Sequence, residues 1–435
     1  MSEIYDVAIV GAGPGGSAAA HYLSLRDFNV LLLDKCTFPR DKTCGDALTP
    51  RALRILDDMG LLDDLLKVGH SLTDVAFFAP KGHSVSAPVP LKESRTDFLL
   101  FIPRLILDNI ILERALASGA QFQSPVRVTD IVQETQCTVI KGVHHNRTVE
   151  FKARMAIVAV GANMKLLLRM GLLKKTPQVM LSARAYFEGM SDMIDAAQCR
   201  FDGVPLPGYG WVFPLSKSSA NIGAGFFRTR LSARQMPVAA PRTARLAFDA
   251  FIQTPPLQRM LRSARQVGPI KGYPLRMDFA RSPTFAERVL LVGEAAGLVN
   301  PVTGEGIDYA LESGKIAADY LTRMFSADDL SIENLARYDQ FLRERCQRLL
   351  VLCDKLRFLY LNPLFLNRVI HSMARNEDLM TLFMNIAIET RTRTCTKDSL
   401  PEQFRRWSSD TIKVLHSSNE GRCCSWPTPA LTGTR

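Results

Sequence analysis

A glycine-rich segment near the start of the chain has the spacing of a diphosphate-binding loop. Residues 11–16 read Gly-Ala-Gly-Pro-Gly-Gly, after a short apolar run at 4–10 and before a helical pattern at 17–25. Glycines let the backbone approach a diphosphate, which the positive end of the helix then binds. Asp34 ends the next apolar run, where a carboxylate can accept hydrogen bonds from an adenosine ribose. These features predict a dinucleotide site. The predicted loop residues are Gly11, Gly13, Gly15 and Gly16.

A second glycine-rich segment, at 293–307, distinguishes between the possible dinucleotides. An apolar run at 288–292 precedes it, Glu294 stands near its start, and a helical pattern follows. FAD needs a second site because its ribityl-flavin half extends far beyond the first loop. The Glu294 carboxylate can bond ribityl hydroxyls, and the helix N-terminus can face the electron-rich pyrimidine end of the flavin. The two segments together predict FAD.

The elements that must position these segments alternate between two kinds of pattern. The β-α-β pattern at 4–33 and the buried-strand pattern at 288–292 are typical of a Rossmann-type nucleotide domain. Strand-rich runs interrupt it. We therefore expect an α/β fold, with a Rossmann-type FAD-binding domain interrupted by a mainly antiparallel-sheet substrate domain and followed by a C-terminal helical region. The expected divisions are 1–72, 101–175 and 285–330 for the FAD-binding domain, 73–100 and 176–284 for the substrate domain, 331–415 for the helical region and 416–435 for a disordered tail.

Composition and charge limit the classes of partner. The chain has 435 residues, 47% of them hydrophobic, so it can bury a large core. Its net charge of +11 includes a basic excess in 341–435, where Leu, Phe and Met are also frequent. This combination suits peripheral contact with a membrane better than nucleic acid, but an ordinary solvated helix face is the preferred interpretation. No run approaches the roughly 20 apolar residues that span a bilayer.

The nine cysteines form no CxxC pair and accompany no His cluster at metal-ligand spacing, so we expect no metal site. Their odd number favours a reducing compartment. The first apolar run leads directly into the glycine loop and does not have the form of a secretory leader. The expected location is cytoplasmic, with contact at the membrane surface as an additional possibility.

Three further segments carry distinctive motifs. Residues 39–51 read PRDKTCGDALTPR, a helix opens at Pro103-Arg104 with Asp108 following, and residues 207–214 read PGYGWVFP. With the segment at 293–307, they resemble the geranylgeranyl reductase family, within the larger group of flavoproteins built like p-hydroxybenzoate hydroxylase. The YxWxFP string is the most discriminating element, because related flavin halogenases carry a different aromatic string there. The resemblance covers about residues 1–330, extends more weakly over the helices to about 390, and does not include the tail. The chain departs from the family pattern at Val160 and Glu294, which both stand where the family has Asp.

The resemblance implies roles for individual residues. The implied FAD contacts are Gly15, Asp34, Cys44, Gly45, Ala47, Arg104, Val128, Glu294, Gly306 and Ile307. It also implies that Tyr209, Trp211 and Phe213 line a substrate tunnel, and aromatic walls suit a polyprenyl chain because that chain offers only apolar surface. Cys44 is the candidate catalytic residue, since the family's cysteine lies near the flavin and could assist proton delivery. A buried packing role for Cys44 is the alternative. Lys42 and Arg51 are expected to be solvated or to face the diphosphate.

These patterns predict an enzyme that reduces isolated carbon-carbon double bonds in the polyprenyl chain of a lipid, quinone or pigment. FAD is the expected cofactor, and NAD(P)H or a ferredoxin is the expected electron donor, since the sequence shows no separate nicotinamide-binding glycine motif. Two alternatives remain open. A flavin-dependent monooxygenase or halogenase would use the same fold on a secondary metabolite. A flavin-free lipid-binding or scaffold protein is the other, motivated by Val160 and Glu294. The oligomeric state is left open.

Overall fold

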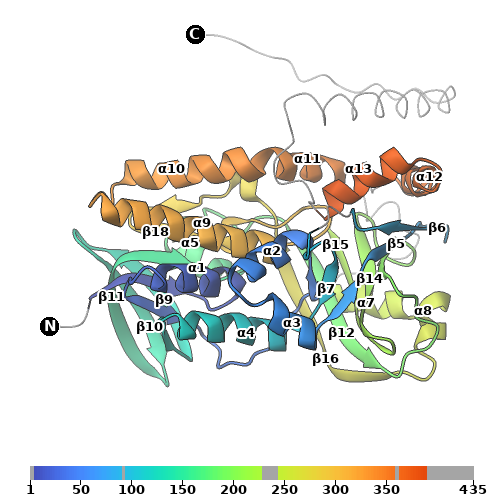
Figure 1. Ribbon diagram of the computed structural model, residues 1–435, viewed down its shortest axis with the longest axis horizontal. Helices are drawn as coiled ribbons and strands as arrows, with labels where there is room; N and C mark the ends of the chain where they lie inside the picture. Colours follow the sequence, from blue (N-terminus) through green and yellow to red (C-terminus); the bar gives the residue numbers. More distant parts are fainter. Residues whose placement is uncertain (1–3, 91–93, 228–242, 358–361, 389–435) are drawn as a thin grey trace, which may run out of the picture. The chain divides into compact units, whose positions relative to one another are not determined.

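The computed structural model describes residues 4–90, 94–227, 243–357 and 362–388 (Figure 1). An eight-stranded sheet carries the nucleotide-binding pattern. Parallel pairing joins β1 to β2 and to β11, and β11 to β18, so segments far apart in the chain lie side by side. The carboxyl ends of these parallel strands therefore meet at one edge. The strands are β1 (Ile4–Val10), β2 (Val30–Leu33), β8 (Gln121–Gln123), β9 (Val126–Gln133), β10 (Thr138–His144), β11 (Arg147–Val158), β17 (Phe285–Ala286) and β18 (Val289–Leu291).

Helices cover this sheet, and two of them cross at glycines. Helix α1 (Pro14–Ser24) packs against α9 (Ile307–Ser326), and a Cβ atom on Gly314 would overlap the carbonyl oxygen of Gly15. The close crossing holds the N-terminal turns of both helices near the carboxyl edge of the sheet. The other helices of this part are α2 (Pro50–Asp58), α3 (Leu62–Val68), α4 (Arg104–Ala117) and α5 (Met164–Arg169).

A seven-stranded sheet follows the order β16-β12-β15-β14-β13-β5-β6 and is antiparallel except where β13 pairs with β5. Helices α7 (Ala244–Ile252) and α8 (Pro255–Met260) belong to the same core, in which Phe248 and Phe251 pack on Val212 and Ile222. The strands are β5 (Asp74–Phe78), β6 (Ser84–Pro88), β12 (Val179–Glu188), β13 (Ala197–Arg200), β14 (Gly208–Ser216), β15 (Ser219–Phe227) and β16 (Arg265–Arg276). A three-stranded sheet contains β3 (Ala47–Leu48), β4 (His70–Leu72) and β7 (Leu99–Phe101).

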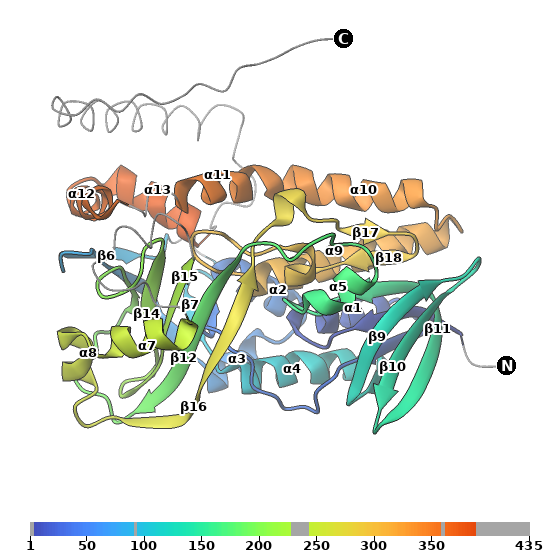
Figure 2. The same ribbon diagram turned by 180° about the vertical axis from the view of Figure 1, so that it is seen from behind.

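Among the residues that the structure describes, four α-helices follow α9, and the first of them, α10 (Ile332–Leu342), lies alongside it (Figures 1 and 2). Further along, the Phe383 ring of α13 (Glu377–Ala387) lies 5.1 Å from the Phe77 ring of β5, which ties this helix to the second sheet. Among the described residues, no helix is long and apolar enough to cross a bilayer. The helices are α10 (Ile332–Leu342), α11 (Arg348–Leu356), α12 (Pro363–Met373) and α13 (Glu377–Ala387).

The predicted fold class is confirmed, with a parallel nucleotide-binding sheet and a mainly antiparallel second sheet. The strands expected at 73–90 are present as β5 and β6, and they pair with β13 in the second sheet. The numbered domain boundaries stay predictions. The tail at 416–435 and the part of the helical region beyond 388 lie outside the described residues.

Candidate functional site

A cavity of about 390 Å³ lies at the carboxyl edge of the first sheet and extends to β14 and β16 of the second. It brings together most residues that the sequence singled out. Those that line it are Gly11, Gly13, Gly15, Asp34, Cys44, Gly45, Arg104, Val128, Tyr209, Trp211, Phe213, Glu294, Gly306 and Ile307. Gly16 and Ala47 do not line it. A Cβ atom on Gly16 would overlap the carbonyl oxygen of Gly11, so this glycine serves the close packing of the loop.

The glycines of the loop have different tasks. Gly11 has φ +109°, and a Cβ atom there would overlap the backbone of Ala159 in the neighbouring β11–α5 turn. At Gly13, by contrast, the nearest atom to an added Cβ is an Arg40 nitrogen at 3.6 Å. Gly13 also precedes α1 and offers no side-chain cap, so the first N–H groups of the helix are free of a side-chain acceptor. This backbone fits a diphosphate.

Two further features of the cavity match the ends of a long dinucleotide. At one end the buried Asp34 carboxylate accepts hydrogen bonds from the N–H groups of Ala12 and Cys36, both at 2.8 Å. At the other, α9 begins after Gly306, again without a side-chain cap, and Ile307 and Ala310 line the cavity. Two uncapped helix N-termini facing one cavity fit a diphosphate and the electron-rich edge of a flavin.

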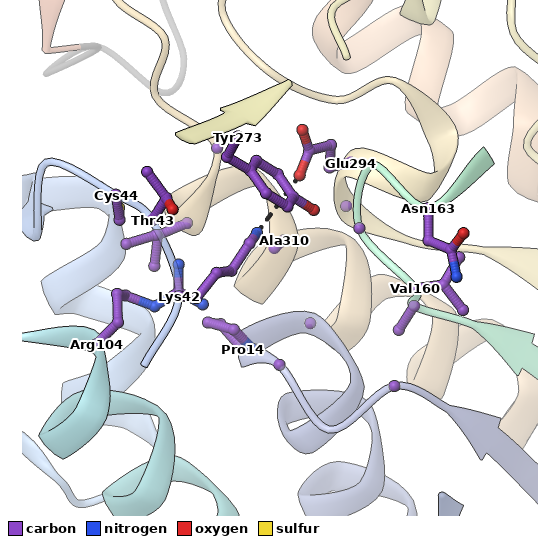
Figure 3. A pocket seen from close by; sticks show the side chains of 18 of the residues that line it. Pro14, Lys42, Thr43, Cys44, Arg104, Val160, Asn163, Tyr273, Glu294 and Ala310 are labelled. Atoms are coloured by element: carbon purple, nitrogen blue, oxygen red, sulfur yellow. Dashed lines mark hydrogen bonds and ion pairs between the residues drawn. The ribbon is translucent and has the colours of Figure 1, made fainter. Parts of the chain in front are cut away.

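A charged cluster of Lys42, Tyr273 and Glu294 lines the same cavity. Figure 3 shows the Lys42 side chain reaching toward Tyr273 and Glu294. Its Nζ lies 3.4 Å from Glu294 Oε2 and 4.7 Å from the centre of the Tyr273 ring. Burial alone would lower the pKa of Lys42, but Tyr273 and Glu294 outweigh it and raise the pKa, so the amine stays charged. Glu294 Oε1 accepts a 3.0 Å hydrogen bond from the backbone N–H of Arg276.

The same cluster approaches the turn that contains Val160. The side chain at 160 lines the cavity and offers no polar group. The Tyr273 hydroxyl instead accepts a 3.0 Å hydrogen bond from the N–H of Ala162, and a Cβ atom on Gly161 would lie 3.5 Å from Glu294 Oε2. The longer Glu294 side chain thus brings a carboxylate to the turn where the family pattern has Asp.

An ion-paired arginine stands beside the candidate cysteine. Arg104 binds Asp108 through two hydrogen bonds of 2.5 and 2.7 Å, and Arg40 lies 2.9 Å from the same carboxylate. Burial alone would lower the pKa of Arg104, but Asp108 raises it well above its usual value. A hydrogen bond to Cys44 contributes to the same shift. A permanently charged guanidinium therefore faces the Cys44 side chain.

A row of aromatic side chains forms the wall beyond Cys44. Tyr209, Trp211 and Phe213 alternate along β14, so they share the face opposite the α7 core. The ring centre of Trp211 lies 5.9 Å from that of Tyr209 and 6.2 Å from that of Phe213. The Phe213 ring lies in turn 5.3 Å from the ring of Phe101. The Tyr209 hydroxyl donates to the Thr303 carbonyl, joining this wall to the loop before α9. The apolar side chains that complete the wall are Met180, Leu275 and Val299.

Sequence reasoning missed the polar groups behind and beside this wall. Asp41 pairs with Arg184 and lies 2.8 Å from Lys271 Nζ, and Asp46 binds Tyr186 and Asn221. Of these residues, only Asp41 and Asp46 lie in a motif that the sequence singled out, PRDKTCGDALTPR.

The prediction that Arg51 is solvated or faces the diphosphate is wrong. Its buried guanidinium pairs with Glu312 and lies 3.6 Å from Asp308, holding α2 against α9. Among the described residues, no group of three or more His, Cys, Asp or Glu side chains is placed so that it could hold a metal ion.

The fold and the site together define an FAD-binding oxidoreductase. The family of FAD binding domains matches this chain over residues 4–185. Menaquinone reductase of Mycobacterium tuberculosis is 32% identical over 419 residues, which cover 94% of this chain and 95% of that protein. Digeranylgeranylglycerophospholipid reductase 1 of Methanopyrus kandleri is 27% identical, covering 77% and 84%. Conditioned medium factor receptor 1 of Dictyostelium discoideum is 28% identical, covering 78% and 67%. The chain belongs to the geranylgeranyl reductase family of FAD-dependent oxidoreductases.

Solved structures agree on the fold. A geranylgeranyl bacteriochlorophyll reductase-like protein from Thermoplasma acidophilum superposes with a TM-score of 0.77 at 20% identity, covering 94% of this chain and 100% of that one. A flavin-dependent brominase reaches a TM-score of 0.74 at 19% identity, covering 95% and 100%. Reductases and halogenases share this architecture, so the fold alone does not choose between them.

Proposed function

We propose that this protein is a reductase that uses FAD to saturate carbon-carbon double bonds in the polyprenyl chain of a lipid, quinone or pigment. The observation that carries the proposal is the continuity of the cavity. The aromatic row of Tyr209, Trp211 and Phe213 lines the same space as Cys44 and the two uncapped helix N-termini. An apolar chain bound along this row has its double bonds beside the cofactor.

Each part of the site has a role in this proposal. Reduced FAD, when bound, supplies a hydride to one carbon of the double bond. A proton must reach the other carbon, and the Cys44 thiol is the proposed donor beside the charged Arg104. The aromatic and apolar wall binds the chain and excludes water. The roles of the loop glycines, Asp34, Glu294 and Gly306 in holding FAD are part of the same proposal.

The relatives support the substrate class. Two of them carry names that specify reduction of menaquinone or of a digeranylgeranyl phospholipid, and both kinds of molecule carry a polyprenyl chain. NAD(P)H or a ferredoxin is the proposed source of electrons. We also propose peripheral contact with the membrane, where such substrates reside, through the basic and apolar C-terminal region.

The two alternatives have less support. A halogenase needs a positioned lysine, but two of the three lysines that line the described cavity are held in ion pairs, Lys42 with Glu294 and Lys271 with Asp41. A monooxygenase would have the same fold, so the dependence of the reaction on oxygen must distinguish it from a reductase. The flavin-free reading conflicts with the match to the FAD binding domain.

The test is anaerobic turnover by the FAD-loaded protein. Dithionite-reduced enzyme is incubated with menaquinone or with digeranylgeranyl phospholipid in detergent, and products are analysed by mass spectrometry. We expect a gain of two hydrogens for each reduced bond of the polyprenyl chain without oxygen, counted on fragments of the chain because dithionite by itself adds two hydrogens to the quinone ring. Product that forms only after oxygen is admitted, with an added oxygen or halogen atom, would instead establish the monooxygenase or halogenase function.

A further inference from the structure

Asp46 is a fully buried acid directly behind the cavity wall. Its side chain is 0% exposed, and it follows Cys44 and Gly45, which line the cavity. Its φ of +66° lies in the left-handed region, which Asp and Asn tolerate better than most residues with a Cβ atom. A buried carboxylate is costly unless hydrogen bonds and charges compensate it, so its surroundings decide what it does.

One amide connects Asp46 to two residues of the cavity wall. Asn221 Nδ2 donates to Asp46 Oδ2 at 2.7 Å and to the Cys44 carbonyl oxygen at 2.7 Å. Its Oδ1 accepts the indole N–H of Trp211 at 2.9 Å. The carboxylate therefore fixes which end of the Asn221 amide faces Cys44 and which end faces Trp211.

The remaining partners of Asp46 come from two elements. From β12, the Tyr186 hydroxyl donates to Asp46 Oδ2 at 2.7 Å and Arg184 contributes a positive charge, while α4 contributes Arg104. Burial raises the pKa of Asp46 to about 6, although these groups and Asn221 all oppose the shift. Burial also raises the pKa of Tyr186, so its hydroxyl remains a donor. Asp46 Oδ1 has no hydrogen-bond partner in the described structure.

We propose that Asp46 is a positioning residue, whose ionised carboxylate holds the Trp211 indole and the Cys44 backbone in place through Asn221. The inference rests on the proposed function, because these two residues shape the wall against which the polyprenyl chain is bound. Protonation makes the carboxyl a weaker acceptor and loosens Asn221. Substrate binding weakens as a result, whereas FAD, most of whose proposed contacts lie on other parts of the cavity, stays bound.

The first test compares KM and kcat of the FAD-loaded wild type and variants from about pH 5 to about pH 8. Asp46→Asn keeps an oxygen acceptor for Tyr186 and Asn221 and tolerates the left-handed φ, but it cannot titrate. We expect the wild-type KM to rise about fivefold to tenfold below pH 6, the size of one hydrogen bond, and the KM of Asp46→Asn to lose this inflection. Asn221→Leu should raise KM at every pH. Asp6→Asn, in β1 and remote from the cavity wall, should behave like the wild type.

A second readout does not depend on the reaction. The chain has three tryptophans, and Trp407 and Trp426 can be replaced by Phe so that fluorescence reports Trp211 alone. We expect the emission of the FAD-loaded protein to change with a midpoint near pH 6, and the change to disappear on adding Asp46→Asn. An emission that does not titrate, or an inflection in KM that survives Asp46→Asn, overturns the positioning role. Absence of polyprenyl reduction with a normal Trp211 titration overturns the proposed function alone.

Discussion

The ring of Phe213 lies directly against the backbone of Gly45, so that a Cβ atom on Gly45 would lie 2.9 Å from Phe213 Cε2. Gly45 follows Cys44 in the segment that lines the cavity, and Phe213 belongs to the aromatic row. The absence of a side chain at Gly45 therefore allows the two walls of the cavity to meet.

Replacing Gly45 with Ala should displace Phe213 and narrow the polyprenyl site. The added methyl lies inside normal contact distance of the ring, which can give way only by moving toward the cavity or toward Phe101. We expect KM for the polyprenyl substrate to rise about tenfold, an effect of about 1.4 kcal/mol on substrate binding. FAD affinity should change less, although Gly45 is a proposed FAD contact, because the added methyl would meet Phe213 and Trp211. Steady-state kinetics and flavin fluorescence measure the two quantities. The double variant with Phe213→Leu should recover much of the loss, and no recovery would show that Phe213 is not the obstacle.

Substitution by alanine should lower stability at Gly11 but weaken FAD binding at Gly13. Gly11→Ala strains a backbone with φ +109° and overlaps Ala159, so we expect loss of stability of roughly 1–3 kcal/mol even without FAD. Gly13→Ala has room in the protein, with only Arg40 nearby at 3.6 Å, but its methyl faces the space proposed for the diphosphate. It should leave unfolding unchanged and weaken FAD binding at least tenfold. Urea unfolding of the apoprotein and FAD titration separate the two effects. Normal FAD affinity of Gly13→Ala would place the diphosphate elsewhere.

Lys42 and Glu294 should be energetically coupled in FAD binding. Lys42 Nζ and Glu294 Oε2 lie 3.4 Å apart, and the lysine side chain is partly exposed. We therefore expect a coupling free energy of only about 1 kcal/mol between the two substitutions. Glu294→Gln keeps an acceptor for the Arg276 N–H, and Lys42→Met keeps most of the aliphatic stem. FAD dissociation constants of the wild type, both single variants and the double variant measure the coupling. Strictly additive effects would mean that the two side chains act on FAD independently.

How far the sequence predicts the site depends on how local each feature is. Gly11 to Gly16 and Glu294 stand in strand-turn-helix segments whose spacing is visible in the chain, and Tyr209, Trp211 and Phe213 share a face because a strand has a period of two. Asn221, by contrast, meets Asp46 across 175 positions and Tyr186 meets it across 140. These contacts depend on the register of β12, β15 and the turn after Gly45, which no local pattern specifies. The prediction for Arg51 failed because its partners on α9 are still more distant in sequence, with Glu312 261 positions away.

The charge on Asp46 should lower the stability of the folded protein at neutral pH. Burial raises the pKa of Asp46 from 3.8 to about 6, so between these values the folded protein keeps a proton that the unfolded chain has released. The resulting stabilisation is complete below about pH 4 and is lost as the pH rises through 6, a loss on the order of 3 kcal/mol at 1.36 kcal/mol per pKa unit.

Asp46→Asn has no such dependence, because its amide does not titrate. The free energy of unfolding of the variant minus that of the wild type should therefore increase by about 2–3 kcal/mol from about pH 4 to about pH 7.5. Urea unfolding at fixed FAD concentration measures this difference, and Asp6→Asn serves as the control. A difference independent of pH would mean that Asp46 titrates as an exposed acid does. A carboxylate that lowers stability at neutral pH, but accepts the Asn221 hydrogen bond more strongly than a neutral amide would, is better explained by its action on Asn221, Trp211 and Cys44 than by a contribution to stability.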